Sequence, residues 1–448
     1  MGRVDRVRKR RLTAALGACG LVVLALPSAL GGGGGRGVPP KARRQPAAEP
    51  GWGVTHTRYT ADHGPAAATR RAAGLLSARS LPQNQHIMGW GAENPEPSPG
   101  HYDFAALDER VALMRSTGAT PVLTLCGAPD WMKGGRAGHT DWSRLETAPD
   151  RRHYADFARL AGVVARRYPD VRHFLVWNEL KGFWNDDRNR WDHEGYTELY
   201  NLVYAELKRR DPRNLVGGPY VVMDHEPPDD EDGSPEVRGA WGALDRRAVD
   251  ALRYWNAHKA GADFVVVDGA SYTREGHRTV PDEFTATGKF ADVTRWLTGV
   301  TGLPVWWAEW YVEPPADDGR PGGRDGWSER HRTAVQAVAM MRLAEGGASA
   351  ALYWNPQRPG GDCPGCLWRG THGDGGGGEL PMGRLLGRFA REFPPGTAFR
   401  PVAAPAGLQV LADDDAVLVV NTRRWPVAAR VDGRTLGLAP YEVRWLAR

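Results

Sequence analysis

Two glutamates of this sequence, Glu179 and Glu309, each stand at the end of a short apolar stretch. Residues 174–177 and 304–308 consist almost wholly of Phe, Leu, Val, Trp, Pro and Ala, and apolar runs of this length are typical of buried strands. Two carboxyl groups about 5 Å apart can break a glycosidic bond with retention, because one protonates the departing oxygen while the other attacks the anomeric carbon. We therefore interpret Glu179 as a candidate acid/base and Glu309 as a candidate nucleophile.

Each glutamate also has a purely structural interpretation. Glu179 could cap the helix that follows it or pair with Lys181. Glu309 follows two tryptophans, and a carboxylate buried among indoles needs a nearby cation if its role is only structural. The presence of both glutamates, with aromatic residues around them, favours the catalytic pair.

The chain around the two glutamates alternates apolar runs with amphipathic helical stretches, which indicates parallel strands joined by crossover helices. Long connections rich in Gly, Pro and Asp follow the strands, as in barrels whose active sites are built by the loops at the strands' C-terminal ends. We therefore predict an α/β fold, a (β/α)8 TIM barrel, in which the glutamates end the fourth and seventh strands. The eight predicted strands are residues 52–59, 85–90, 120–126, 173–177, 215–222, 264–269, 304–308 and 350–354.

After residue 395 the helical pattern stops and short strands are predicted at 407–411, 416–421, 428–431 and 441–446. These strands predict a small C-terminal all-β module. The domain boundaries that follow are a signal peptide or membrane anchor at 1–30, a disordered linker at 31–50, the catalytic barrel at 51–394 and a β-sandwich-like module at 395–448.

The net charge of +5 comes from the N-terminus, because residues 1–50 contain ten Lys and Arg against two acidic residues and the remainder carries −3. A mildly acidic body argues against a nucleic-acid partner. The basic stretch before the apolar run 12–30 is typical of an export signal, so we expect a secreted protein. An uncleaved, outward-facing membrane anchor is the alternative.

Trp177-Asn178-Glu179 resembles the acid/base signature of the clan A glycoside hydrolases, and Ala308-Glu309-Trp310 resembles their nucleophile strand. Within that clan the chain most resembles family 39, the β-xylosidases and α-L-iduronidases, over residues 52–390. The resemblance implies a barrel followed by a β-rich segment. The sequence departs from the family at Leu180, where proline is usual, and at Ala308, where threonine or serine is frequent.

The resemblance also implies substrate-binding residues near the strand ends. Tyr272 is expected to hydrogen-bond the nucleophile, Trp354 to stack on a sugar, and Asn178 to bind a sugar hydroxyl. Since the apolar faces of sugars pack well on aromatic rings, the remaining pocket candidates are His56, Trp90, Trp131 and Trp310.

The cysteines offer no metal site. Cys363 and Cys366 are close in sequence and could form a disulfide outside the cytoplasm, and no second pair is present for zinc. Cys126 is expected to be buried.

Together these features predict a retaining glycoside hydrolase that cleaves β-glycosidic bonds by double displacement, with no cofactor and no metal. Its partner is an oligo- or polysaccharide, with β-xylosides the first expectation. The alternatives are a non-catalytic carbohydrate-binding barrel and an endo-acting β-glycanase of the same clan. The sequence does not determine the oligomeric state.

Overall fold

The structure is a computed structural model that describes residues 49–57, 60–315, 326–354, 356–358 and 363–447. The proposed leader at 1–30 and nearly all of the linker at 31–50 lie outside the described residues. The described residues belong to one compact unit. Within the described part of the chain, no helix is long and apolar enough to cross a membrane.

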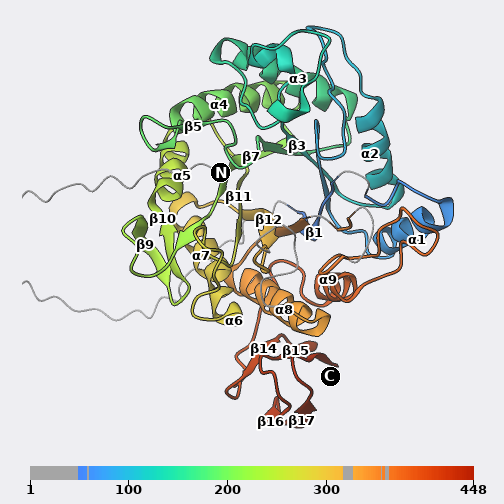
Figure 1. Ribbon diagram of the computed structural model, residues 1–448, viewed down its shortest axis with the longest axis vertical. Helices are drawn as coiled ribbons and strands as arrows, with labels where there is room; N and C mark the ends of the chain where they lie inside the picture. Colours follow the sequence, from blue (N-terminus) through green and yellow to red (C-terminus); the bar gives the residue numbers. More distant parts are fainter. Residues whose placement is uncertain (1–48, 58–59, 316–325, 355, 359–362, 448) are drawn as a thin grey trace, which may run out of the picture. The chain divides into compact units, whose positions relative to one another are not determined.

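Eight parallel strands form a closed barrel, so the predicted fold class is confirmed (Figure 1). Neighbours in the barrel follow chain order, because each strand pairs with the next one and the last pairs with the first. Every predicted strand overlaps an observed one. The strands are β1 (Gly51–Thr55), β2 (Gln83–His86), β3 (Pro121–Leu125), β4 (His173–Val176), β7 (Leu215–Val222), β11 (Phe264–Ala270), β12 (Val305–Tyr311) and β13 (Ala350–Trp354).

Helices surround the barrel and bury one apolar face each (Figure 1). In α3, for example, the residues at helical spacing from Tyr154 to Val164 are buried. Helix α8 begins after Ser328, whose hydroxyl accepts from the His331 amide, and ends at Gly347 with φ 86°. The helices are α1 (Ala66–Ser77), α2 (Ala105–Ser116), α3 (Tyr154–Arg167), α4 (His193–Arg210), α5 (Arg246–His258), α6 (Glu283–Ala286), α7 (Gly288–Thr301), α8 (Glu329–Gly346) and α9 (Pro381–Glu392).

The barrel interior is filled by one set of alternating strand residues. Phe264 and Trp306 stack there with ring centroids 3.8 Å apart. The register between neighbouring strands then shifts at two places. In β12, Ala308 has no partner in β11, and in β7 Tyr220 has none. Such bulges re-aim the side chains beside them and are frequent next to active sites.

Two small sheets lie within the connections between barrel strands. The strands β8 (His225–Glu226), β10 (Gly242–Asp245) and β9 (Gly233–Gly239) form one, and β5 (Trp184–Asn185) pairs with β6 (Arg190–Trp191) in the other. The long connection at 223–240 therefore contains short strands that were not predicted. Its acidic residues did not suggest strands, but Arg274 pairs with Glu226 at 2.9 Å, which offsets part of the charge.

The C-terminal residues form two further sheets beside α8 (Figure 1). The strands β14 (Leu408–Ala412), β15 (Ala416–Asn421) and β18 (Val443–Ala447) make a three-stranded antiparallel sheet, and β16 (Val427–Val431) pairs with β17 (Arg434–Leu438). The sequence analysis missed β17, whose Arg434 and Thr435 are exposed. This module has its own small hydrophobic core, and some of its residues also belong to the main core of the barrel.

Candidate active site

Glu179 follows β4 in an unusual turn. Trp177, Glu179 and Leu180 all have positive φ values, of 69°, 50° and 50°. Such conformations are unfavourable for residues other than glycine and persist where the surroundings enforce them. The buried Trp177 indole does so by donating to the Lys181 carbonyl at 2.8 Å. Proline cannot adopt a positive φ, so the departure at Leu180 matches the local backbone.

Glu309 follows the bulge in β12 and is only 2% exposed. The Tyr220 hydroxyl donates to its Oε1 at 2.8 Å, and the Tyr311 hydroxyl donates to its Oε2. Both carboxylate oxygens are thereby held. The hydrogen bond expected from Tyr272 is instead made by Tyr220, because the bulge at Tyr220 turns that side chain into the barrel interior beside Glu309.

A third carboxyl group, Asp268, joins the two glutamates. Carboxylate oxygens of Glu179, Asp268 and Glu309 all lie within 4.8 Å of one another. Asp268 lies in β11 directly opposite Glu309 and is 1% exposed. The sequence analysis missed it, although the apolar run 264–267 ends in a carboxylate as the other two strands do.

The three carboxyl groups cannot all be ionised at such distances. Burial, together with the charge of Glu179, raises the pKa of Asp268 well above its usual range. Burial and the same charge raise the pKa of Glu309 to about 8, against the opposing hydrogen bonds from the two tyrosines. Burial would also raise the pKa of Glu179, but the Asp268 hydrogen bond and the Lys181 ammonium lower it overall.

Lys181 links the cluster to the loop after β3. Its Nζ lies 2.9 Å from Glu179 Oε2 and donates to Glu146 Oε1 at 2.7 Å. The ammonium also lies 5.4 Å from the centroid of the Trp90 ring. The pairing of Glu179 with Lys181, which the sequence allowed as a structural role, is therefore present together with the carboxyl cluster.

Buried polar atoms without partners surround the carboxyl cluster. Within the described residues, no hydrogen bond of good geometry reaches the ring nitrogens of His86 or Oδ1 of Asn178, although Asn178 lies close enough to His86 to raise its pKa. Burial lowers the pKa of His86 to about 3, so its ring is neutral. Such groups are rare in folded proteins and are explained where a ligand supplies the missing partners.

Aromatic rings enclose this polar centre. The His86 ring lies 4.8 Å from that of Trp90 and 6.1 Å, edge to face, from that of Trp354. The sequence analysis named both tryptophans but missed His86, because β2 is a polar strand whose burial is not visible in its composition. Asn178, the remaining expected contact residue, is 3% exposed.

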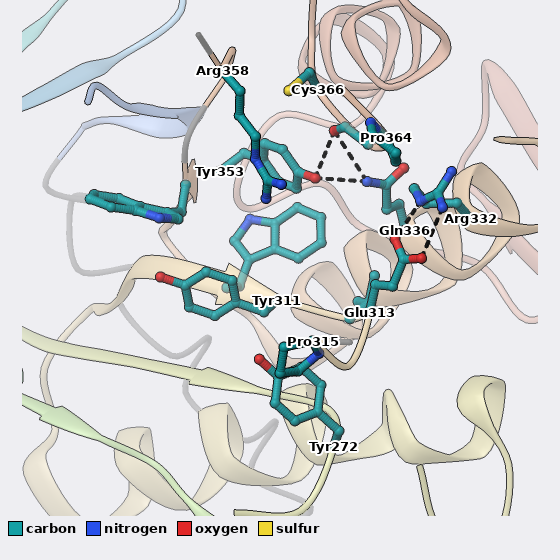
Figure 2. A pocket seen from close by; sticks show the side chains of 14 residues that line it. Tyr272, Tyr311, Glu313, Pro315, Arg332, Gln336, Tyr353, Arg358, Pro364 and Cys366 are labelled. Carbon is teal, nitrogen blue, oxygen red and sulfur yellow. Dashed lines mark hydrogen bonds and ion pairs between the residues drawn. The ribbon is translucent and has the colours of Figure 1, made fainter. Parts of the chain in front are cut away.

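A cavity of about 230 Å³ (Figure 2) is here called the Tyr311 cavity, because Tyr311 both lines it and donates to Glu309 of the cluster. Its wall includes Tyr311, Trp310, Trp354 and Tyr272. The Arg358 side chain extends into it in Figure 2, beside Tyr353.

Buried contacts hold the far side of this cavity in place. Tyr353 donates to the Gly365 carbonyl at 2.7 Å, and Arg332 forms an ion pair with Glu313 (Figure 2). Cys363 and Cys366 form the predicted disulfide, with Cα atoms 5.5 Å apart, and Cys126 is buried as expected.

Two expected pocket residues have other roles. Trp131 is packed into the loop after β3, where its indole donates to the Glu96 carbonyl at 2.9 Å and contacts His153. His56 is 1% exposed, bonds Gln83 at 2.8 Å and is not among the residues that line the Tyr311 cavity.

The carboxyl cluster is also the group of side chains, among those described, whose spacing could hold a metal ion. Both Glu309 oxygens already accept hydrogen bonds from Tyr220 and Tyr311, which leaves the three carboxylates fewer free oxygens than the six or more that calcium takes. The Lys181 ammonium already provides a positive charge beside Glu179. The donor set therefore suits proton chemistry better than a resident cation.

No protein-family sequence profile and no curated protein sequence matches this chain. Solved structures, in contrast, do match this chain. A conserved exported protein from Bacteroides fragilis has a TM-score of 0.61 at 13% identity, covering 88% of this chain and 96% of that one.

A family 39 glycoside hydrolase from Bacteroides cellulosilyticus WH2 has a TM-score of 0.56 at 14% identity, covering 88% of this chain and 80% of that one. A monomeric β-xylosidase from Caulobacter crescentus CB15 has a TM-score of 0.51 at 17% identity, covering 85% and 75%. The chain thus shares the fold of family 39 glycoside hydrolases, as its motifs led us to expect.

Proposed function

We propose that this protein is a retaining glycoside hydrolase in which Glu309 is the nucleophile and Glu179 the acid/base. The observation that carries the proposal is the approach of their carboxylate oxygens within 4.8 Å, from strands β4 and β12. Retaining enzymes need a carboxyl separation of about 5 Å, whereas inverting enzymes need roughly 6.5–9.5 Å to admit water. The aromatic walls and the partnerless polar atoms of His86 and Asn178 suit a polyhydroxylated ligand.

In the first step Glu309 attacks the anomeric carbon while Glu179 protonates the departing oxygen, which leaves a glycosyl ester on Glu309. In the second, Glu179 takes a proton from water, whose oxygen attacks the same carbon and releases Glu309. Tyr220 and Tyr311 hold the attacking carboxylate in both steps. The separation of the pair argues against the alternative of a misaligned, non-catalytic site.

This mechanism also requires the proton of the cluster to lie on a particular carboxyl group. In the free cluster the pKa directions favour a proton on Glu309 and charge on Glu179, and catalysis requires the reverse. Because the groups titrate together, the arrangement belongs to the cluster rather than to either residue. A sugar hydroxyl or glycosidic oxygen that displaces Lys181 from Glu179 would raise the pKa of Glu179 and move the proton to it.

Among substrates, β-xylosides come first, because one similar structure is named a β-xylosidase, and other β-linked sugars follow. The basic and apolar N-terminal sequence supports export of the protein. Mass spectrometry of the mature protein from culture medium would test this, since a chain retained in the cytoplasm with an intact N-terminus would contradict export.

Replacing Glu309 by Ala tests the central assignment. We expect Glu309→Ala to lose hydrolysis of 4-nitrophenyl β-glycosides by a factor of at least about 10⁴, the upper range for a positioned catalytic group. Added azide should restore turnover and give the glycosyl azide of inverted configuration, because azide fits where the carboxylate was removed. The matched control is Glu206→Ala, because Glu206 pairs with Arg209 and Arg210 on helix α4 and lines neither the Tyr311 cavity nor the carboxyl cluster. Unchanged turnover in Glu309→Ala would remove that residue from the mechanism.

A further inference from the structure

A second cavity, of about 360 Å³, lies beside Trp90, whose ring contacts that of His86 next to the carboxyl cluster. We call it the Trp142 cavity. Its wall carries the indoles of Trp90 and Trp142, the apolar side chain of Leu145 and the carboxyl groups of Glu93 and Glu109. Flat apolar rings with nearby hydrogen-bond acceptors are what a sugar ring with its hydroxyls requires.

Trp142 is 42% exposed, which is unusual for the largest apolar side chain. It lies in a short 3-10 helix, Trp142–Arg144, whose first turn is capped by Asp141. The next residue, Leu145, packs so closely on Gly89 that a Cβ at Gly89 would collide with it. The loops after β2 and β3 therefore hold each other, and the exposed indole sits on a fixed support.

The Trp142 cavity is joined to the acid/base by a short chain of contacts. Glu146, four residues after Trp142, binds Lys181 at 2.7 Å, and Lys181 lies 2.9 Å from Glu179. Trp90, which lines this cavity, is covered by the same ammonium at 5.4 Å. One lysine side chain thus separates the cavity wall from the proton donor.

Residues of the catalytic centre contact the walls of both cavities. Tyr311 both lines the first cavity and holds the nucleophile Glu309. His86 contacts Trp354 of the first cavity and Trp90 of the second. The sugar that becomes attached to Glu309 therefore occupies the Tyr311 side. The oxygen that Glu179 protonates leads away from it, past Lys181 toward Trp90.

We propose that the Trp142 cavity binds the leaving-group side of a β-linked glycan chain, so that the substrate is an oligo- or polysaccharide rather than a simple glycoside. This inference rests on the proposed function and specifies its substrate class. The same cavity also binds acceptor sugars in the second step. An acceptor hydroxyl then attacks the anomeric carbon, Glu179 takes the hydroxyl proton, and the bond to Glu309 breaks.

The test compares two substrates of one sugar: the 4-nitrophenyl β-glycoside that the wild-type chain hydrolyses fastest and the β-linked tetrasaccharide of that sugar. The measured quantity is the ratio of kcat/KM for the tetrasaccharide to that for the aryl glycoside. We expect Trp142→Ala to lower this ratio at least tenfold and Glu109→Gln to lower it severalfold. Transfer of the glycosyl group to added tetrasaccharide, relative to hydrolysis, should fall in both variants.

The matched control is Trp425→Ala, because Trp425 is another exposed indole, at 51%, but belongs to the C-terminal module. Its ratio should equal that of the wild type. An unchanged ratio in both Trp142→Ala and Glu109→Gln, or a wild-type enzyme that cleaves aryl glycosides but not the tetrasaccharide, would overturn the inference alone. A wild-type chain inactive on every glycoside would instead overturn the proposed function.

Discussion

Two variants of Asp268 can distinguish the role of its hydrogen bond from the role of its negative charge. Burial and the charge of Glu179 raise the pKa of Asp268 well above its usual range, which favours the neutral form that can donate a hydrogen bond to Glu179. Asn is also neutral and also donates, so Asp268→Asn should keep kcat within about tenfold. Asp268→Ala removes the donor, and a hydrogen bond to a charged group contributes roughly 1.5–3 kcal/mol, a factor of about 10–100 in kcat. Steady-state kinetics on one aryl glycoside measures both, and equal losses in the two variants would show that ionised Asp268 is required.

Lys181 sets the pH range of activity. Its ammonium lowers the pKa of both Glu179 and Glu309, and activity is lost as pH rises and the cluster gives up the proton that Glu179 must hold for catalysis. In Lys181→Met the pKa of Glu179 rises, so the alkaline limb of kcat/KM should move to higher pH by about one unit or more. The matched control is Lys208→Met, since Lys208 pairs with Asp263 at 2.8 Å instead. An alkaline limb at the wild-type position would show that Glu179 does not govern it.

At the scale of residues, the sequence indicated the site residues that stand at the ends of apolar strands. It did not indicate the residues that only the tertiary structure brings next to them. Glu179, Glu309, Trp310 and Trp354 were recognisable by position. Tyr220 was not, because it lies within a predicted strand and reaches Glu309 through a register shift that leaves no local signal. His86 was hidden for a similar reason, since a buried polar strand resembles an exposed one in sequence.

At the scale of elements, the barrel depends on close contact between strands β7 and β11. Gly217 pairs with Phe264, and a Cβ at Gly217 would meet the Phe264 ring, which stacks on Trp306. Gly217→Ala should therefore destabilise the protein by about 1–3 kcal/mol through overpacking. In the opposite sense, Gly299→Ala on the exposed side of α7 meets nothing within 4 Å and should stabilise by about 0.5–1 kcal/mol. Thermal unfolding of both variants tests whether the two substitutions change stability in opposite directions. A Gly217→Ala protein as stable as the wild type would mean that the barrel interior can accommodate the added methyl group.

The elements themselves were the best predicted level, for a physical reason. The burial of parallel strands on both faces produces continuous apolar runs, so β7 and β13 fall at their predicted bounds. The antiparallel strand β15, which is also buried on both faces, does so for the same reason. The short strands β8 and β9 carry acidic residues balanced by arginines from elsewhere in the chain, such as Arg253 with Glu236. That balance is tertiary, and no pattern within the segment reveals it.

At the scale of the molecule, the C-terminal sheets are an extension of the barrel's core rather than an independent body. Along β15, Ala416, Leu418 and Val420 belong to the main core, while Val417 and Val419 face the core of the module itself. This two-sided burial follows from the alternation of side chains along a strand. One face of β15 therefore depends on the barrel for its apolar contacts.

Because the two parts share a core, they should unfold together. Trp445 of β18 packs on Phe393, with centroids 5.3 Å apart, and on Phe389 of α9, while Trp425 in the same module is half exposed. Trp445→Ala should lower the free energy of unfolding by on the order of 2 kcal/mol. The loss is smaller than for a fully buried tryptophan because Trp445 is only half-buried. Trp425→Ala should leave the free energy of unfolding nearly unchanged. Calorimetry should give one transition for the wild type, shifted as a whole in Trp445→Ala. A separate early transition confined to residues 395–448 would show that the module folds by itself, with the contact to α9 merely docking it onto the barrel.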